Sequence, residues 1–344
     1  MYDMVWVQRF GINGTNTGEV DMGDLTIGID LGGTNIVAAA TDANAKILER
    51  EKVKTEPGES LAATAEKMRE AASQVLETIE KGWDDVLNVG IAIPSAIDPA
   101  TGDLLHAPNL GWQDEPALAT LETVFGCRVF LQNDVNCGVL AEYRLGAARG
   151  ASTVAGFLVG TGLGGGLIIN GRVYPCRRGC AGELGHQIVK VKGAKCGCGN
   201  RGCLEAYSSK TGFGRRFRKQ IEKKGKSSML TELVGNNLSN VKSKHLKTAY
   251  LADDSVVTKT LNRGARMLGV GAANMMTILA PDCIVFGGGV IEALGEALLP
   301  YIREGMEAHL FGVKPEDVSL RISELGDDAV PLGAALVAQA EGNV

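Results

Sequence analysis

The stretch TIGIDLGGTNIVAAATD, residues 26–42, holds two apolar runs separated by a turn that contains two glycines, a threonine and an asparagine. A third run, AKILEREKV at residues 45–53, follows after a short break. Short apolar and β-branched runs bounded by turn residues are typical of strands. Residues 26–53 are therefore predicted to form a three-stranded meander.

A second part of the chain repeats this arrangement. TVAGFLVG at 153–160 leads into the turn TGLGGG at 161–166, and LIINGRVY at 167–174 resumes as a strand. In both places a β-rich run breaks at glycines and a threonine. The repetition predicts two similar lobes.

Helical and strand patterns alternate through the rest of the chain. The segment 61–81 places Leu61, Met68, Val75 and Leu76 on one face at helical spacing. Further helices are expected at 215–224, 258–279 and 295–309, and buried strands at 86–94, 129–134 and 283–290. This alternation predicts an α/β fold.

The composition argues against several classes of protein. The 344 residues carry a formal net charge of −5, and no run approaches the roughly 18 apolar residues of a membrane span. Binding to nucleic acid or to an anionic membrane is therefore not expected. The N-terminus lacks a secretion signal pattern, so a cytoplasmic protein is expected, and residues 1–24 are expected to be a mobile leader.

The turn DLGGTN is a candidate phosphate loop. Glycines let backbone N–H groups approach a phosphate closely, Thr34 can donate its hydroxyl, and Asp30 can hold a hydrated Mg²⁺ ion. A plain hairpin turn is the alternative interpretation of this motif taken alone. The residues expected to contact the nucleotide here are Asp30, Gly32, Gly33, Thr34 and Asn35.

Two further glycine-rich turns follow in the chain. GTGLGGG supplies Thr161, Gly162 and Gly164, and FGGG supplies Gly287 and Gly288. Three such turns, the first led by an acidic residue, fit one nucleotide held between two lobes. A Rossmann or P-loop site is not expected, because the first loop leads into a strand and the P-loop lysine is missing.

DLGGTN, GTGLGGG, ELGH and CGCGNRGCLE, in this order, resemble the ROK family of bacterial sugar kinases and repressors. The resemblance spans about residue 25 to the C-terminus and implies a two-lobed actin-like ATPase (ribonuclease-H-like) fold with the active site in the interlobe cleft. It implies an N-terminal lobe over 25–133, completed by a C-terminal helix at 330–344. The second lobe, with a zinc-binding loop, would cover 134–329.

The resemblance is strongest to the family's glucokinases, and it implies transfer of the γ-phosphoryl group of ATP, with Mg²⁺, to the 6-hydroxyl of glucose. Asp134 matches the family's catalytic base, which would accept the hydroxyl proton. An Asx cap on the following helix is the alternative role for Asp134. The residues that match the family's sugar contacts are Ser95, Asn109, Asn133, Asp134, Glu183, His186 and Glu205.

The cysteine-rich segment contributes a candidate metal site. Cys196, Cys198 and Cys203 lie close in sequence to His186, and three cysteines with one histidine are an accepted tetrahedral zinc set. The resemblance implies a structural Zn²⁺ on these four residues. Cys176 and Cys180 depart from the family pattern and are expected to be free thiols that could compete for metal.

Several alternatives remain open at this stage. The sugar could be N-acetylmannosamine, N-acetylglucosamine, fructose or allose, and the donor could be polyphosphate. A sugar-responsive repressor is disfavoured, because the segment before residue 26 is too glycine-rich for a helix-turn-helix domain. A sugar-binding module without catalysis is disfavoured by Asp134. Family habit implies a homodimer.

Overall fold

The computed structural model describes residues 25–344 apart from 57, 108, 175–180 and 236. The segment 1–24, expected to be a leader, and both Cys176 and Cys180 lie outside the described residues.

The predicted meander at 26–53 is confirmed as three antiparallel strands of the first sheet. Two parallel strands extend the sheet on the other side, so that its order is β3-β2-β1-β4-β8. The strands are β1 (Leu25–Leu31), β2 (Asn35–Thr41), β3 (Ile47–Lys54), β4 (Val86–Ile93) and β8 (Val129–Asn133).

The second sheet has the same connectivity, with the order β11-β10-β9-β12-β13. Its first three strands are antiparallel, and β12 and β13 are parallel to β9. The strands are β9 (Val154–Val159), β10 (Leu163–Ile169), β11 (Arg172–Val173), β12 (Cys283–Gly287) and β13 (Ser319–Ile322). The repetition read from the sequence thus corresponds to two sheets of one topology.

A small third sheet was not predicted. Its strands are β5 (Ala96–Ile97), β6 (Leu104–Ala107) and β7 (Trp112–Glu115), too short to show a periodic pattern in the sequence. The α-helices are α1 (Leu61–Thr78), α2 (Ala117–Phe125), α3 (Asp134–Arg144), α4 (Glu205–Ser208), α5 (Lys210–Ile221), α6 (Leu230–Val234), α7 (Ser243–Leu251), α8 (Ser255–Leu279), α9 (Gly289–Glu307) and α10 (Ala329–Gln339).

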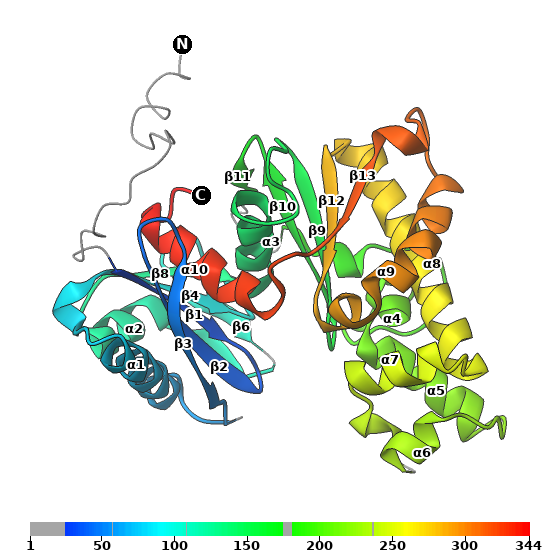
Figure 1. Ribbon diagram of the computed structural model, residues 1–344, viewed down its shortest axis with the longest axis horizontal. Coiled ribbons are helices and arrows are strands. Elements are labelled where there is room, and N and C mark those ends of the chain that lie inside the picture. The colour runs from blue at the N-terminus through cyan, green and yellow to red at the C-terminus, as the bar shows by residue number, and fades with distance from the viewer. Residues whose placement is uncertain (1–24, 57, 108, 175–180, 236) are drawn as a thin grey trace.

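The helices and sheets form alternating layers (Figure 1). Helices α1 and α2 cover the outer face of the first sheet, and α8 and α9 cover the outer face of the second. Helices α3 and α10 pack against each other between the two sheets. This arrangement confirms the predicted α/β class with two similar lobes.

The close packing of α3 and α10 between the two sheets depends on glycines, because neighbouring elements approach too closely there to leave room for a side chain. A Cβ atom on Gly28 or Gly90 would collide with the backbone of α10, and one on Gly333 of α10 would collide with the Cys137 carbonyl of α3. On the other side of α3, Gly156 of β9 faces the side chain of Val139 at a distance that admits no Cβ. The first sheet, α10, α3 and the second sheet are therefore in direct contact.

Helix α10 lies against β1 and β4 of the first sheet, although it is the last helix of the chain and that sheet is formed by strands from the N-terminal part. The lobe boundaries at 133/134 and 329/330 stay predictions, because α3 and α10 contact both each other and a sheet. No helix in the described ranges combines the length and apolar character needed to cross a membrane.

We expect Gly333→Ala to lower the free energy of unfolding by about 2–4 kcal/mol in urea titrations, because the new methyl group would force α3 and α10 apart. Helix propensity alone predicts the opposite sign, a gain of about 1 kcal/mol. Gly82→Ala is the matched control, since no atom lies within 4 Å of a Cβ there and its φ of −123° suits alanine. Equal effects of both changes would contradict this account of the middle layer.

Candidate active site

The first glycine loop joins β1 to β2. Its turn is closed by Gly32, whose N–H donates to the Asn35 carbonyl at 2.9 Å. Thr55, just after β3, donates its N–H to the Thr34 carbonyl and its hydroxyl to the Gly32 carbonyl at 2.7 Å. The loop therefore has a fixed shape before any ligand binds.

A pocket of about 580 Å³ opens over this loop. All five residues that the sequence predicted as nucleotide contacts in the first loop line it. They are Asp30, Gly32, Gly33, Thr34 and Asn35, joined by Val37, Arg50, Glu51, Lys52 and Asp327. The pocket thus combines backbone N–H groups with carboxylates and cations, as a phosphate and metal site requires.

Asp30 and Asp327 line this pocket, and a third carboxylate, that of Asp134, lies close enough to act on Asp30. The pKa of Asp30 is raised to about 7, first by burial and then by the negative charges of Asp134 and Asp327, while Lys52 opposes the shift. The three acids come from the end of β1, the start of α3 and the turn before α10. A cation placed among them would relieve the repulsion, so these residues fit a Mg²⁺ ion.

Asp134 begins α3, but it does not cap the helix. The cap is Asn133, whose side-chain oxygen accepts from the N–H groups of Val135 and Asn136. Burial raises the pKa of Asp134, the Val135 N–H bond opposes that shift, and the charge of Glu183 adds to it. The alternative role of Asp134 as the helix cap is therefore wrong, and its carboxyl group lies near that of Glu183.

Three further residues predicted as sugar contacts, Ser95, Asn109 and Asn133, differ in whether their polar groups are free to bind a sugar. Asn109 is exposed, and its Cβ lies 3.5 Å from the Cβ position at Gly33. Ser95 is buried, and its hydroxyl lies 2.9 Å from the carbonyl oxygens of Ala96 and His106. The Asn133 amide donates to the Ser95 carbonyl at 3.3 Å. Ser95 and Asn133 thus already use their polar groups within the protein.

The second glycine loop meets Glu205. The N–H of Leu163 donates to Glu205 Oε2 at 3.2 Å, and a Cβ on Gly162 would come within 2.7 Å of that oxygen. Gly164 faces the side chain of Val135 on α3, so its contacts are packing contacts. Its predicted role in phosphate binding stays a prediction.

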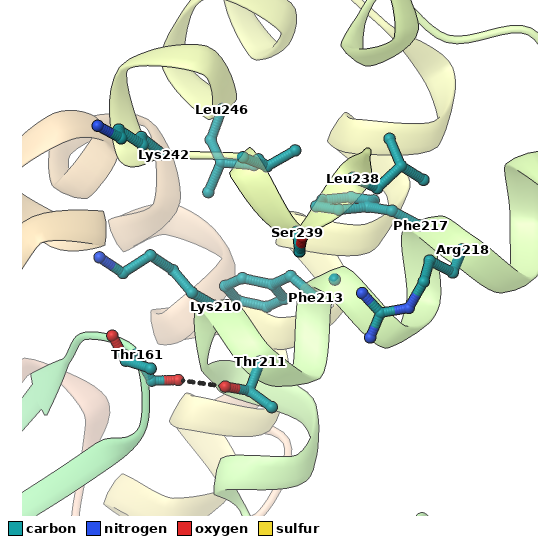
Figure 2. Close-up of a pocket in the computed structure, with 12 residues that line it drawn as sticks. Thr161, Lys210, Thr211, Phe213, Phe217, Arg218, Leu238, Ser239, Lys242 and Leu246 are labelled. Atoms are coloured by element: carbon teal, nitrogen blue, oxygen red, sulfur yellow. Dashed lines mark hydrogen bonds between the residues drawn. The ribbon is translucent and has the colours of Figure 1, made fainter. Parts of the chain in front are cut away.

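Thr161 of this loop opens onto a second pocket, of about 290 Å³ (Figure 2). The hydroxyl of Thr211 donates to the Thr161 carbonyl at 2.8 Å and anchors the loop to α5. Figure 2 shows Lys210 and Lys242 extending over the pocket, with the rings of Phe213 and Phe217 among its lining. The pocket thus combines an apolar lining with three cations, since Arg218 lines it together with Lys210 and Lys242.

The third glycine loop lies beside the end of β9, where the second loop begins. Gly288 has φ +81°, a conformation that favours glycine, and a Cβ there would meet the backbone of Val159 at 2.8 Å. A Cβ on Gly287 would meet Leu158 and Ser323. The second and third loops are therefore neighbours in space, as the sequence interpretation required.

His186, Cys196, Cys198 and Cys203 form one cluster, with a ligand atom from each within 4.8 Å of the others. The Cys198 and Cys203 sulfurs are 3.6 Å apart, and Cys196 Sγ lies 3.7 Å from His186 Nδ1. Sulfurs around a tetrahedral Zn²⁺ at 2.3 Å would be about 3.8 Å apart, so the cluster fits zinc. The Sγ atom of Cys196 also lies 3.2 Å from Glu205 Oε1, so the cluster adjoins the side chain that contacts the second glycine loop.

Sequence reasoning missed several residues that line these pockets, namely Arg50, Lys52, Lys210, Lys242 and Asp327. The lysines stand in charged segments that look like ordinary solvated surface. Asp327 lies in LGDDAVPLGAA, which resembles the tail of the family's glucokinases, but nothing local in that segment indicates that it meets Asp30.

Comparisons with known proteins agree with this geometry. The model of the ROK family matches residues 26–341. A glucokinase of Halalkalibacterium halodurans is 32% identical over 92% of this chain and 96% of its own length. A xylose repressor of Caldicellulosiruptor bescii is 27% identical, and the match covers 91% of this chain and 77% of the repressor.

Among solved structures, a ROK family glucokinase from Streptomyces griseus, determined in complex with glucose and AMPPNP, is similar with a TM-score of 0.78. It is 32% identical, and the match covers 92% of this chain and 99% of that chain. The expected actin-like ATPase fold is therefore confirmed.

The raised pKa of Asp30 predicts a pH-dependent stability in protein without added Mg²⁺. Between the usual pKa of 3.8 and about 7 the folded state holds the proton more tightly than the unfolded state, so the free energy of unfolding should fall as pH rises through this range. Asp30→Asn should remove that part of the slope and raise stability at pH 8 by about 1–4 kcal/mol. Urea titrations at pH 5 and pH 8 measure this, and an unchanged slope would contradict it.

Proposed function

The chain belongs to the ROK family, and we propose that it is an ATP-dependent hexose kinase that transfers the γ-phosphoryl group of ATP to the 6-hydroxyl of glucose. The observation that carries the proposal is the buried Asp134 carboxyl group, whose charge acts on Asp30 in the pocket over the first glycine loop. A phosphoryl transfer needs a proton acceptor next to a phosphate site, and these residues supply both.

Asp134 acts as the general base. Asn133 caps the helix, and Asp134 Oδ1 accepts from the Val135 N–H at 2.9 Å, which leaves Asp134 Oδ2 for a sugar hydroxyl. Burial raises its pKa, which makes the ionised carboxylate a stronger proton acceptor. The proton of the 6-hydroxyl passes to this carboxylate as the hydroxyl oxygen attacks the γ-phosphorus. The bond from that phosphorus to the β–γ bridging oxygen breaks, and ADP leaves with the bonding electron pair.

The glycine loops and cations hold the nucleotide. Backbone N–H groups of the first two loops cradle the phosphates, and Lys52 adds positive charge at their edge. The pocket beside Thr161 suits the nucleoside, because its apolar lining can cover a base while Lys210 and Lys242 face the phosphates. Mg²⁺ held through Asp30 would neutralise part of the phosphate charge.

The sugar lies between Asn109, Glu183, His186 and Glu205. Asn109 lies beside Gly33 of the first glycine loop, Glu205 lies beside Gly162 of the second, and the charge of Glu183 acts on Asp134. Together with His186 they would offer donors and acceptors to several hydroxyls at once. A site of this kind rejects sugars that leave its polar groups unpaired. Ser95 and Asn133 support the site through their contacts with the backbone rather than through free polar groups.

Zn²⁺ would bind to His186 Nδ1 and the sulfurs of Cys196, Cys198 and Cys203. Four protein ligands would leave the metal no open position, so it would shape the loop and supply no chemistry to the transfer. Nδ1 faces Cys196, which leaves Nε2 of His186 as the donor to a sugar hydroxyl. A homodimer, implied by the family resemblance, belongs to this proposal as well.

We expect purified protein with ATP to phosphorylate glucose with a higher kcat/KM than fructose, allose, N-acetylglucosamine or N-acetylmannosamine. Polyphosphate should replace ATP poorly, because the pocket beside Thr161 would then lack its base. A coupled assay across this panel measures both preferences. No phosphorylation of any sugar, together with binding to DNA in a gel-shift assay, would favour the repressor alternative.

Asp134→Asn should lower kcat by about 10²–10⁴-fold and leave the KM for glucose within about threefold, because the amide keeps the shape but cannot accept the proton. Asp84→Asn, at an exposed carboxyl group, is the matched control and should keep the wild-type kcat. Retention of most activity by Asp134→Asn would remove this residue from the mechanism.

Cys198→Ser should release zinc and raise the KM for glucose by about tenfold or more, with little change in the KM for ATP, because the loop positions His186 and Glu205. The same change at Cys127, distant from the cluster, should alter neither quantity. Metal analysis and steady-state kinetics measure these effects. Wild-type protein without zinc but with a normal KM for glucose would contradict the proposal.

A further inference from the structure

Positive charge is concentrated in one segment of this acidic chain. Residues 187–226 contain twelve lysines and arginines and only two acidic residues, both glutamates, whereas the whole chain has a net charge of −5. The segment runs from the cysteine-rich loop through α4 and α5, in the second lobe (Figure 1). Neither the proposed catalytic groups nor the proposed zinc ligands explain this concentration.

Seven of the cations of the second lobe surround one pocket of about 480 Å³. Its walls are the turn before Cys196, the face of α5 that carries residues 212, 215, 216 and 219, and the start of α8. The cations are Lys190, Lys192, Lys195, Arg215, Arg216, Lys219 and Arg263. We call it the basic pocket.

The positive charge of the basic pocket is not neutralised within the described part of the chain. No acidic residue is among those that line it, and none of its seven cations forms an ion pair there. Like charges brought together repel, so this arrangement costs free energy that a bound anion would recover. The surplus therefore points to an anionic ligand with several charges.

The walls of the basic pocket are already assembled. Arg215 donates to the Lys195 carbonyl, which ties α5 to the turn. The N–H of Ala194 donates to the Tyr207 hydroxyl at 2.7 Å, and the Arg263 guanidinium lies 5.7 Å from the centre of the Tyr207 ring. A preformed pocket loses little freedom when a ligand binds.

The basic pocket is distinct from the proposed nucleotide pockets. Helix α5 turns residues 210, 211, 214 and 218 toward the pocket beside Thr161 and residues 212, 215, 216 and 219 toward the basic pocket. Of the described lining residues, Phe213 is shared by both. A ligand in the basic pocket would instead contact the turn just before Cys196 and the helix that carries Glu205.

We propose that the basic pocket binds a small molecule with at least two phosphoryl groups. Guanidinium groups bind phosphate through paired hydrogen bonds, and lysines add unpaired positive charge. The volume lies within the range of small-molecule sites, about 300–1,000 Å³. The concave shape favours a compact phosphorylated ligand over a nucleic acid or a membrane, which would contact an extended surface.

The test is calorimetric titration at constant ionic strength with two probes, inorganic tripolyphosphate and fructose 1,6-bisphosphate. The pocket variant carries Lys192→Gln, Arg216→Gln and Lys219→Gln, at exposed side chains. The matched control carries Lys223→Gln, Lys224→Gln and Lys226→Gln, which removes the same charge from exposed positions of the same segment that do not line the pocket.

We expect wild type and the control to bind at least one probe with one site per chain, and the pocket variant to bind it at least about tenfold more weakly. The probe that binds more tightly distinguishes an inorganic polyphosphate from a phosphorylated metabolite. Unchanged binding by the pocket variant would place the anion at the glycine loops and overturn the proposal. Equal loss in both variants, or binding of duplex RNA or anionic vesicles without either probe, would overturn it as well. None of these measurements depends on kinase activity.

Discussion

The contact of α3 with α10 between the two sheets is the constraint on which the rest of this structure depends. Two helices fit there because glycines remove the side chains that would keep the backbones apart, at Gly28 and Gly90 of the first sheet and Gly333 of α10. Close packing of this kind resists deformation, because even one added methyl group has no room. The start of α3, and with it Asp134, is therefore held in a fixed position relative to both sheets.

A buried carboxylate extends this constraint to the phosphate pocket. Glu142 of α3 is 1% exposed and accepts hydrogen bonds from the Ser323 hydroxyl at 2.6 Å and from the N–H groups of Glu324 and Leu325. These bonds fix the segment between β13 and α10, which carries Asp327 into the pocket over the first glycine loop. A buried charge is tolerated here because several donors satisfy it. Helix α3 thus orients Asp134 at its start and, through Glu142, the segment that carries Asp327.

The distribution of charge follows from the same architecture. Carboxylates from both ends of the chain meet near Asp30, where burial and mutual repulsion raise its pKa, so this part of the cleft suits a cation and the phosphates that accompany it. The basic pocket lies on the other side of α5 from the pocket beside Thr161. It is lined by lysines and arginines, and none of its described lining residues is acidic. The chain is acidic overall, but its surface is divided into regions of opposite character, and each region favours a different kind of ligand.

The sequence by itself determined the features that depend on neighbours along the chain. The apolar runs and glycine turns predicted the meander at 26–53 and the α/β class, and the four motifs indicated the family. Only the tertiary structure decided that Asn133 rather than Asp134 caps α3, that Gly164 packs against Val135, and that Asp327, Lys52 and Lys210 line the pockets. The strands at 96–115 are too short for periodicity to indicate them. Periodicity and turn chemistry are local, whereas contacts between residues far apart in the chain depend on how the sheets and helices pack, which no local pattern encodes.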